Sequence, residues 1–189
     1  MRLFVALSIP PELRENIASL IQNLRRADAR PRWVNPENLH ITLKFIGEVH
    51  PEKLLAIGDA LATIRTGQTL TLNFRNVGFF PNVRHPSVAW IGIEAPPALA
   101  SLAVYINRVL APLGIRHEVK PFVPHLTIAR FTENRLSPAL RVEIERWKNH
   151  IFGAFITGEI HLIESRLKSS GAEYTTLRSF PFAQKDSQG

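Results

Sequence analysis

The chain contains periodic runs of apolar and polar residues, and turn-forming residues separate one run from the next. These runs predict a regular series of strands and helices. The first half predicts strand, helix, strand, helix and strand over residues 1–9, 11–24, 39–47, 51–64 and 69–80. The second half predicts the same order over residues 87–95, 97–110, 125–131, 137–147 and 152–165. Each half therefore reads as a β-α-β-α-β unit.

Two short sequences mark equivalent points in the two halves. A Pro-Pro pair opens the first helix of each half, at Pro10-Pro11 and at Pro96-Pro97, and the pairs lie 86 residues apart (96 − 10). The sequence His-x-Thr also occurs twice, at His40 and at His125, which lie 85 residues apart (125 − 40). The near-equal offsets predict that one unit is repeated within the chain.

We expect this repeat to form a single domain. The repeats cover about residues 1–81 and 87–168, and a C-terminal strand over 172–182 completes a domain of residues 1–189. A rough twofold axis between two such units would bring the two His-x-Thr strands together at the centre of the molecule.

The His-x-Thr sequences place polar side chains on one face of otherwise apolar strands. Successive side chains of a strand point to opposite faces, so His40 shares a face with Thr42, and His125 with Thr127. Two imidazoles on either side of a phosphodiester can serve as general base and general acid near neutral pH. Threonine hydroxyls can bind the phosphate oxygens. The pattern therefore predicts phosphodiester chemistry in a cleft, without a metal ion.

Composition and charge narrow the class of protein. The 189 residues include no cysteine, which excludes disulfides, thiol catalysis and cysteine-based zinc sites, and no third metal ligand is evident beside the two histidines. A formal net charge of +7 favours a polyanionic partner, with RNA or DNA as the first candidate. No apolar run is long enough to span a bilayer and no signal peptide is recognisable, so we expect a cytoplasmic protein that does not bind membranes.

The two histidine motifs and their flanking sequences resemble the 2H phosphoesterase superfamily, which is named for its two histidines. The wider resemblance, from Met1 to about Phe182, is to the bacterial and archaeal RNA 2′,3′-cyclic phosphodiesterases, formerly called 2′-5′ RNA ligases. It is carried by "MRLFVALSIPPEL", "HITLKFIGEV", "VGFFPNVRHPSVAWIGIE", "PFVPHLTIARF" and "ESRLKSSGAEYTTLRSFPF". The resemblance implies an α+β fold of two pseudo-symmetric lobes, each with an antiparallel sheet and helices, and a central cleft that carries both His-x-Thr strands.

The resemblance also implies an activity and a role for each motif residue. Members of the family hydrolyse a 2′,3′-cyclic phosphate at an RNA end to a 2′-phosphomonoester, without a metal or another cofactor. Carried over to this sequence, His40 is the expected proton donor and His125 the expected proton acceptor, and Thr42 and Thr127 hold the non-bridging oxygens. The expected partners are RNA ends that bear a cyclic phosphate, such as those of tRNA halves, and we expect a monomer.

Two cations and several aromatic residues are further candidates for binding the substrate. Lys44 shares strand parity with His40, which predicts that it points into the site. Arg130 follows the second motif as it does in the family, and an arginine suits phosphate, but strict alternation places it on the face opposite His125. It reaches the site only if the strand twists or bulges. The candidates for stacking on a base are Phe45, Phe79, Phe80 and Phe122.

Three other functions stay open at the level of the sequence. The same site could join RNA ends as a 2′-5′ RNA ligase, although in water hydrolysis should win over joining. A non-catalytic module could bind RNA or a nucleotide, although a pure binder would tolerate the loss of either histidine. A phosphodiesterase of the same superfamily could act on a small nucleotide such as an ADP-ribose cyclic phosphate.

Overall fold

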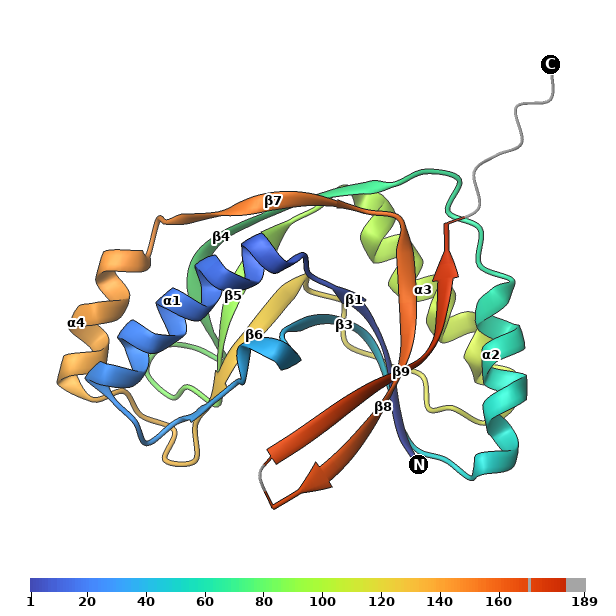
Figure 1. The fold of residues 1–189 in the computed structure, drawn as a ribbon, viewed down its shortest axis with the longest axis horizontal. Coiled ribbons are helices and arrows are strands. Elements are labelled where there is room, and N and C mark those ends of the chain that lie inside the picture. Colours follow the sequence, from blue (N-terminus) through green and yellow to red (C-terminus); the bar gives the residue numbers. More distant parts are fainter. Residues whose placement is uncertain (170, 183–189) are drawn as a thin grey trace.

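The computed structural model describes residues 1–169 and 171–182, so residues 170 and 183–189 of the expected domain lie outside the description. Within the described residues the chain forms four α-helices and two antiparallel sheets (Figure 1). The α+β class with two antiparallel sheets, which the resemblance implies, is therefore confirmed. None of the helices in these residues is both long and apolar enough to cross a lipid bilayer.

The two sheets, which we call sheet A and sheet B, adjoin where β3 lies beside β6. From edge to edge, sheet A contains β3 (His40–Glu48), β1 (Arg2–Ser8), β8 (Glu159–Lys168) and β9 (Gly171–Pro181). Sheet B contains β2 (Arg32–Trp33), β6 (His125–Arg130), β5 (Val88–Glu94), β4 (Leu70–Phe80) and β7 (Ile151–Thr157). Neighbouring strands in both sheets run antiparallel.

The helices form two pairs, one on each flank of the molecule (Figure 1). The pair α1 (Pro11–Ala27) and α4 (Pro138–Trp147) packs against β7 and β4 of sheet B. The pair α2 (Leu54–Ala62) and α3 (Pro97–Leu110) packs against β9 and β3 of sheet A. Short 3₁₀ turns occupy Pro36–Asn38, Pro51–Lys53 and Ala111–Leu113. Each sheet therefore has one face covered by helices.

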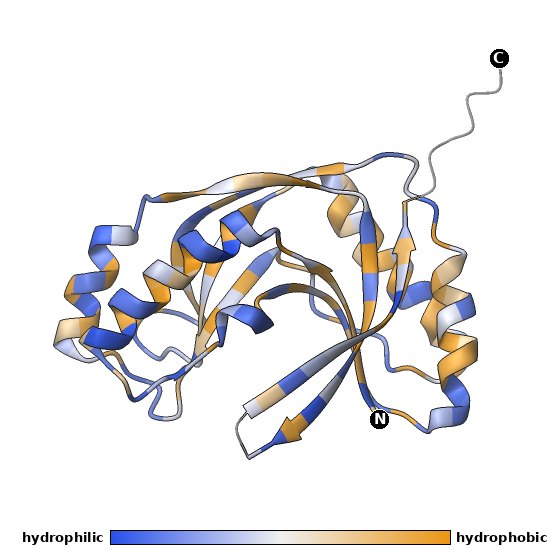
Figure 2. Ribbon diagram, viewed as in Figure 1, coloured by the Kyte–Doolittle hydropathy of each residue, from blue (hydrophilic) through white to orange (hydrophobic). Residues whose placement is uncertain are grey.

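The local sequence explains where these helices begin and which side they bury. α1 and α3 begin at the second proline of each Pro-Pro pair, a position where a missing N–H leaves no hydrogen bond unmade. In α4 the Ser137 hydroxyl accepts a hydrogen bond from the backbone N–H of Leu140 at 3.2 Å, which caps the first turn. α1 is striped with apolar and polar residues (Figure 2), and its apolar residues are buried.

Each sheet combines strands from both halves of the chain. β4, the last strand of the first half, pairs with β5 and β7 in sheet B, whereas β8 from the second half pairs with β1 in sheet A. The helices are exchanged in the same way, because α1 covers sheet B and α3 covers sheet A. The two sheets therefore do not coincide with residues 1–81 and 87–168, and the duplication of those segments stays a prediction.

The single long strand expected over residues 152–165 is wrong, because the chain changes sheets at Gly158. β7 ends at Thr157 on the edge of sheet B, and β8 begins at Glu159 in the interior of sheet A. A continuous run of β-forming residues predicts extended backbone, but it does not tell which strand each part pairs with.

One hydrophobic core runs through both lobes. It lies between each sheet and its helices, and it includes Val5 of β1 and Phe74 of β4. A smaller apolar cluster of Phe4, Ala6 and Ile163, with half-buried Tyr174 against it, lies on the other face of sheet A. The helix-free face of each sheet is therefore available to carry polar side chains.

Candidate active site

The polar side chains of β3 lie on the helix-free face of sheet A. His40 and Thr42 are half-buried, whereas Ile41, which lies between them, is fully buried in the core. His40 stands opposite Ser8 and Thr42 opposite Ala6 in the ladder to β1. Because directly opposed residues of neighbouring antiparallel strands project from the same face, both side chains share the face of the cluster around Ala6.

β6 presents the second motif in the same manner on sheet B. His125 and Thr127 are half-buried, and Leu126 between them is fully buried. They stand opposite Gly92 and Trp90 of β5. Since β3 and β6 are neighbours, the two polar faces meet where the sheets adjoin. The structure therefore brings both His-x-Thr strands together, 85 residues apart in the chain (125 − 40).

Both strands contain an irregularity directly after the threonine. In β3 the register to β1 shifts after Thr42, so that Lys44 rather than Leu43 stands opposite Val5. In β6 the register to β5 shifts after Thr127, so that Ala129 stands opposite Ala89. One extra residue of this kind is a β-bulge, and it reverses the faces of the residues that follow it.

Lys44 does not point into the site, so its expected placement is wrong. The bulge turns the side chain into the core, where it is only 1% exposed. Its Nζ donates a hydrogen bond to the carbonyl oxygen of Arg116 at 2.6 Å and lies 3.9 Å from the Glu118 carboxylate. Burial lowers the pKa of the Lys44 amine, and the charge of Glu118 opposes this effect. Phe45, the next residue, is exposed beside Phe4 instead.

The bulge in β6 has the opposite consequence for Arg130. Arg130 stands opposite Val88, which projects from the same face of β5 as Trp90, the partner of Thr127. Arg130 therefore shares the face of Thr127 and His125, which strict alternation alone does not predict.

Each imidazole is oriented by a backbone carbonyl two residues earlier in the chain. Nδ1 of His40 lies 2.7 Å from the carbonyl oxygen of Asn38, and Nδ1 of His125 lies 2.7 Å from that of Val123. A carbonyl oxygen can only accept, so Nδ1 donates and carries the proton. Nε2 of each ring is thus left for a substrate. It accepts a proton when the ring is neutral and donates one when the ring is charged.

Aromatic rings pack against both imidazoles. The ring of His40 lies 4.8 Å from Phe4 and 5.2 Å from Tyr174, measured between centroids. The ring of His125 lies 5.0 Å from Phe80, which in turn packs at 5.1 Å against Trp90. Among the aromatic candidates, Phe80 therefore contacts a histidine. Phe79 and Phe122 pack on the core.

These surroundings lower the pKa of both imidazoles below the ordinary value. For His40, burial is the largest cause, the Asn38 carbonyl partly opposes it, and the charges of Arg130 and His125 lower the pKa further. For His125, burial is again the largest cause, Val123 partly opposes it, and Arg130 lowers the pKa further. The guanidinium of Arg130 is thus close enough to both rings to disfavour their charged forms.

No cluster of acidic and imidazole groups suited to a metal ion is present in the described part of the chain. In residues 1–169 and 171–182, no three His, Asp or Glu side chains are grouped so that they could hold a cation. Metal-independent chemistry stays a prediction, drawn from the two imidazoles.

Several residues on this face were not identified from the sequence. Phe4 stands opposite Phe45 in the ladder to β3, whereas Trp90 stands opposite Thr127 in the ladder to β6, so the two rings do not occupy equivalent positions. Both are apolar residues within strand-like runs, and no local pattern distinguishes them from core residues. Tyr174 reaches His40 only because β9 pairs with β8 in sheet A, and no local pattern predicts that pairing.

Known proteins share both the sequence and the fold of this chain. The family model of LigT-like phosphoesterases matches residues 7–90. The RNA 2′,3′-cyclic phosphodiesterase of Archaeoglobus fulgidus is 36% identical over 180 residues, which cover 95% of this chain and 99% of that protein. The RNA 2′,3′-cyclic phosphodiesterase of Methanothermobacter thermautotrophicus is 33% identical over 181 residues, which cover 95% and 98%.

A solved crystal structure has the same fold as this chain. The crystal structure of E. coli LigT complexed with 3′-AMP superimposes with a TM-score of 0.79 and 29% identity, over 97% of this chain and 98% of that one. The similarity thus extends along nearly the whole of each protein and includes the arrangement of the sheets. The chain belongs to the 2H phosphoesterase superfamily and, within it, to the LigT-like family of RNA 2′,3′-cyclic phosphodiesterases.

Proposed function

We propose that this protein hydrolyses the 2′,3′-cyclic phosphate at the end of an RNA chain to a 2′-phosphomonoester. The observation that carries the proposal is the pair of half-buried imidazoles on adjoining strands, each with Nδ1 bound to a carbonyl and Nε2 left for a substrate. Relatives over 30% identical along nearly their whole length bear the name of this activity, which supports the choice of substrate.

The reaction needs one proton acceptor and one proton donor. Nε2 of neutral His125 accepts a proton from a water molecule while the water oxygen forms a bond to phosphorus. Nε2 of charged His40 donates its proton to the 3′ oxygen while the bond between that oxygen and phosphorus breaks. His125 is then charged and His40 neutral, and proton exchange with solvent restores the starting state.

The assignment of donor and acceptor rests on the family resemblance, since the contacts of the two rings are alike. Both rings bind a carbonyl two residues earlier, and both pack against aromatic side chains. A substrate whose leaving group needs no proton therefore separates the two roles.

The charge that develops on the phosphate meets neutral and cationic donors. The hydroxyls of Thr42 and Thr127, which share the faces of the histidines, donate hydrogen bonds to the non-bridging oxygens. The guanidinium of Arg130 and the imidazolium of His40 balance the additional negative charge in the transition state. These groups replace the electrostatic role that a metal ion has in other phosphodiesterases.

The decisive experiment combines a defined RNA end with a chelator. The purified protein is incubated with EDTA and a short RNA that ends in a 2′,3′-cyclic phosphate, and the product end is identified by mass spectrometry and phosphatase sensitivity. We expect a 2′-phosphate from the wild type. His40→Ala and His125→Ala should each lower kcat/KM at least about 100-fold. His50→Ala, which removes an exposed imidazole, is the matched control and should keep full activity.

Two outcomes would contradict the proposal. An RNA end that stays cyclic while the RNA binds would make the protein a binding module, and a product that forms only when EDTA is omitted would require a metal. Thermal unfolding of each variant shows whether a loss of activity comes from a loss of folding.

A further inference from the structure

Two arginines stand directly opposite each other beside the candidate active site. Arg32 of β2 pairs with Arg130 of β6, and the next pair, Trp33 with Ala129, packs on the core. The two exposed arginine side chains therefore project from the other face, which is the face of His125 and Thr127. Like charges in directly opposed positions destabilise a pair of strands. Their presence here indicates a site that is completed by an anion.

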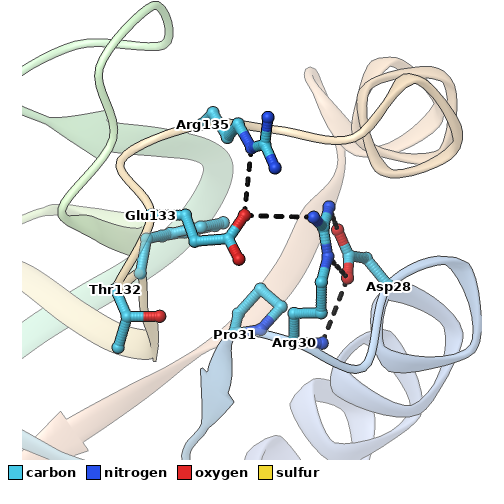
Figure 3. A pocket seen from close by; sticks show the side chains of 7 residues that line it. Asp28, Arg30, Pro31, Thr132, Glu133 and Arg135 are labelled. Carbon is cyan, nitrogen blue, oxygen red and sulfur yellow. Dashed lines mark hydrogen bonds and ion pairs between the residues drawn. The ribbon is translucent and has the colours of Figure 1, made fainter.

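The acidic side chains near β2 are already paired with other arginines (Figure 3). Arg30 lies 2.7 Å from Asp28 and 3.1 Å from Glu133, and Arg135 lies 3.0 Å from Glu133. A side-chain hydrogen bond from Arg30 holds the pKa of the Asp28 carboxyl well below its usual range. This carboxylate therefore stays charged and bound to Arg30.

Arg32 and Arg130 are left without such a partner in the described residues. Across residues 1–169 and 171–182, the arginines that form ion pairs with a carboxylate are Arg14, Arg30, Arg75, Arg135, Arg146, Arg166 and Arg178. Each guanidinium group carries about five N–H donors, so the two unpaired groups offer about ten on the histidine face of sheet B. The fork geometry of these donors suits a phosphate.

The backbone of β2 is fixed although the strand has only two residues. The indole N–H of Trp33 donates to the carbonyl oxygen of Asp28 at 2.9 Å, and the N–H of Val34 donates to the carbonyl oxygen of Ile128 at 2.9 Å. Arg32 is therefore attached to a backbone that is already in place before a ligand arrives. Such preorganisation reduces the entropy that binding must overcome.

Arg32 and Arg130 lie beside the place proposed for the reacting phosphate, further along sheet B than the two histidines. The charge of Arg130 reaches both imidazoles, whereas Arg32 lies one strand further out, on the edge of sheet B. Along β6 each residue advances about 3.3 Å, so the arginines follow Thr127 on a path that leads away from His125. A second phosphate of the same strand of RNA would meet them on this path.

We propose that Arg32, together with Arg130, binds the internucleotide phosphate that precedes the cyclic end, and that it thereby favours the end of an RNA chain over a cyclic mononucleotide. This inference rests on the hydrolysis proposed above. Arg32 is then a residue that determines substrate specificity, whereas Arg130 serves the reacting phosphate as well.

The test compares two substrates that differ by one phosphodiester. Adenosine 2′,3′-cyclic phosphate lacks an internucleotide phosphate, and the dinucleotide ApA with a 2′,3′-cyclic end contains one. Arg32→Gln should lower kcat/KM for the dinucleotide about tenfold more than for the mononucleotide, as expected for one charge-assisted hydrogen bond. Arg141→Gln, which removes an exposed arginine from α4 behind sheet B, is the matched control and should affect both substrates equally.

A third substrate removes the charge from the RNA instead of the protein. In a dinucleotide whose internal linkage is a neutral methylphosphonate, the wild type should lose the same factor, and Arg32→Gln should cause no further loss. Thermal unfolding adds a readout without substrate. Because Arg32→Gln relieves repulsion between opposed guanidinium groups, the variant should unfold at the same or a higher temperature at low salt.

The outcomes separate this inference from the function on which it rests. Equal losses on both substrates, no loss on either, or a lower unfolding temperature for Arg32→Gln would each overturn the role of Arg32. If the wild type hydrolyses neither substrate, the proposed hydrolysis itself fails. If it hydrolyses both but prefers the mononucleotide, the hydrolysis stands and the preference for an RNA chain fails.

Discussion

The carbonyl oxygens of Asn38 and Val123 determine which nitrogen of each histidine stays free of a hydrogen bond to the backbone. Both accept from Nδ1 at 2.7 Å, so the two rings enter the site with the same nitrogen and the same tautomer. Under the proposed mechanism, the difference between donor and acceptor must then lie in which side of the phosphate each ring occupies. That difference can be measured with a leaving group that needs no proton.

A cyclic phosphate with sulfur in place of the 3′ oxygen should separate the two histidines. A thiolate leaves without protonation, so His40→Ala should regain most of its lost rate on this substrate. His125→Ala should not, because water still has to lose a proton. Rates of thiol release, measured with a thiol reagent for both variants and the wild type, test this. Recovery of His125→Ala instead of His40→Ala would exchange the two roles.

The pH profile should report the lowered pKa values of both imidazoles. Activity requires a neutral acceptor and a charged donor, so kcat/KM falls below the pKa of one ring and above that of the other. Because burial and Arg130 lower both pKa values, we expect a bell whose maximum lies on the acid side of 6.5, the ordinary imidazole value.

Arg130→Gln should move this bell to higher pH. The substitution removes a cation that disfavours the charged form of both rings, so both pKa values rise. The rate at the maximum should also fall about 10- to 100-fold, since a charged donor to the phosphate is lost. A profile that keeps its position, or that moves to lower pH, would place the Arg130 guanidinium away from the histidines.

At the scale of single elements, one bulge in each of β3 and β6 decides which cation lies on the face of the histidines. The bulge in β3 turns Lys44 into the core, and the bulge in β6 turns Arg130 onto the polar face. The equivalent positions Phe45 and Arg130, 85 residues apart (130 − 45), both follow the bulge and are both exposed.

Lys44→Met should therefore leave catalysis almost unchanged. The substitution removes a buried amine and its hydrogen bond to Arg116, so kcat/KM should stay within about threefold of the wild type, less than 1 kcal/mol in the barrier. The free energy of unfolding, from urea titration, should change by no more than about 1.5 kcal/mol, because the lost hydrogen bond is offset by relief of a desolvated charge.

Thr42→Val is the matched control on the other face of the same strand. It removes one hydroxyl at nearly constant volume, and kcat/KM should fall about tenfold. If Lys44→Met lost as much activity as Thr42→Val with unchanged stability, Lys44 would have to contact the substrate.

The elements themselves were largely predictable, and the contacts between them were not. The Pro-Pro pairs and the apolar stripe of α1 are local signals, and local sequence decides them. The bulges after Thr42 and Thr127 depend on the register to β1 and β5, which alternation along one strand does not contain. For the same reason strict alternation assigned the wrong face to both Lys44 and Arg130, and only a bulge, which the sequence could not locate, brings Arg130 to the face of His125.

At the scale of the whole molecule, the exchanged elements tie the two lobes together. β4 and α1 contribute to sheet B, and β8 and α3 contribute to sheet A, so each sheet contains elements from both halves of the chain. A single core that includes Val5 and Phe74 follows from this exchange. Neither half alone can complete a sheet.

We therefore expect the protein to unfold in one cooperative step. Tryptophan fluorescence reports on sheet B and its helices, since Trp33, Trp90 and Trp147 lie in β2, β5 and α4. Hydrogen exchange of amides in β1 and β8 reports on sheet A. The two measurements should give the same free energy of unfolding. A stable, cooperatively folded fragment of residues 1–81, or a lower value for one sheet, would contradict this expectation.

Because β3 and β6 belong to one polypeptide, the side chains at corresponding positions of the two strands can differ. Two identical subunits that met through these strands would present the same side chain at every equivalent position. Here Phe45 occupies one such position and Arg130 the other, so an apolar ring accompanies His40 and a cation accompanies His125. A single chain can thus place different side chains beside its two histidines before any substrate binds, which an assembly of identical copies could not do.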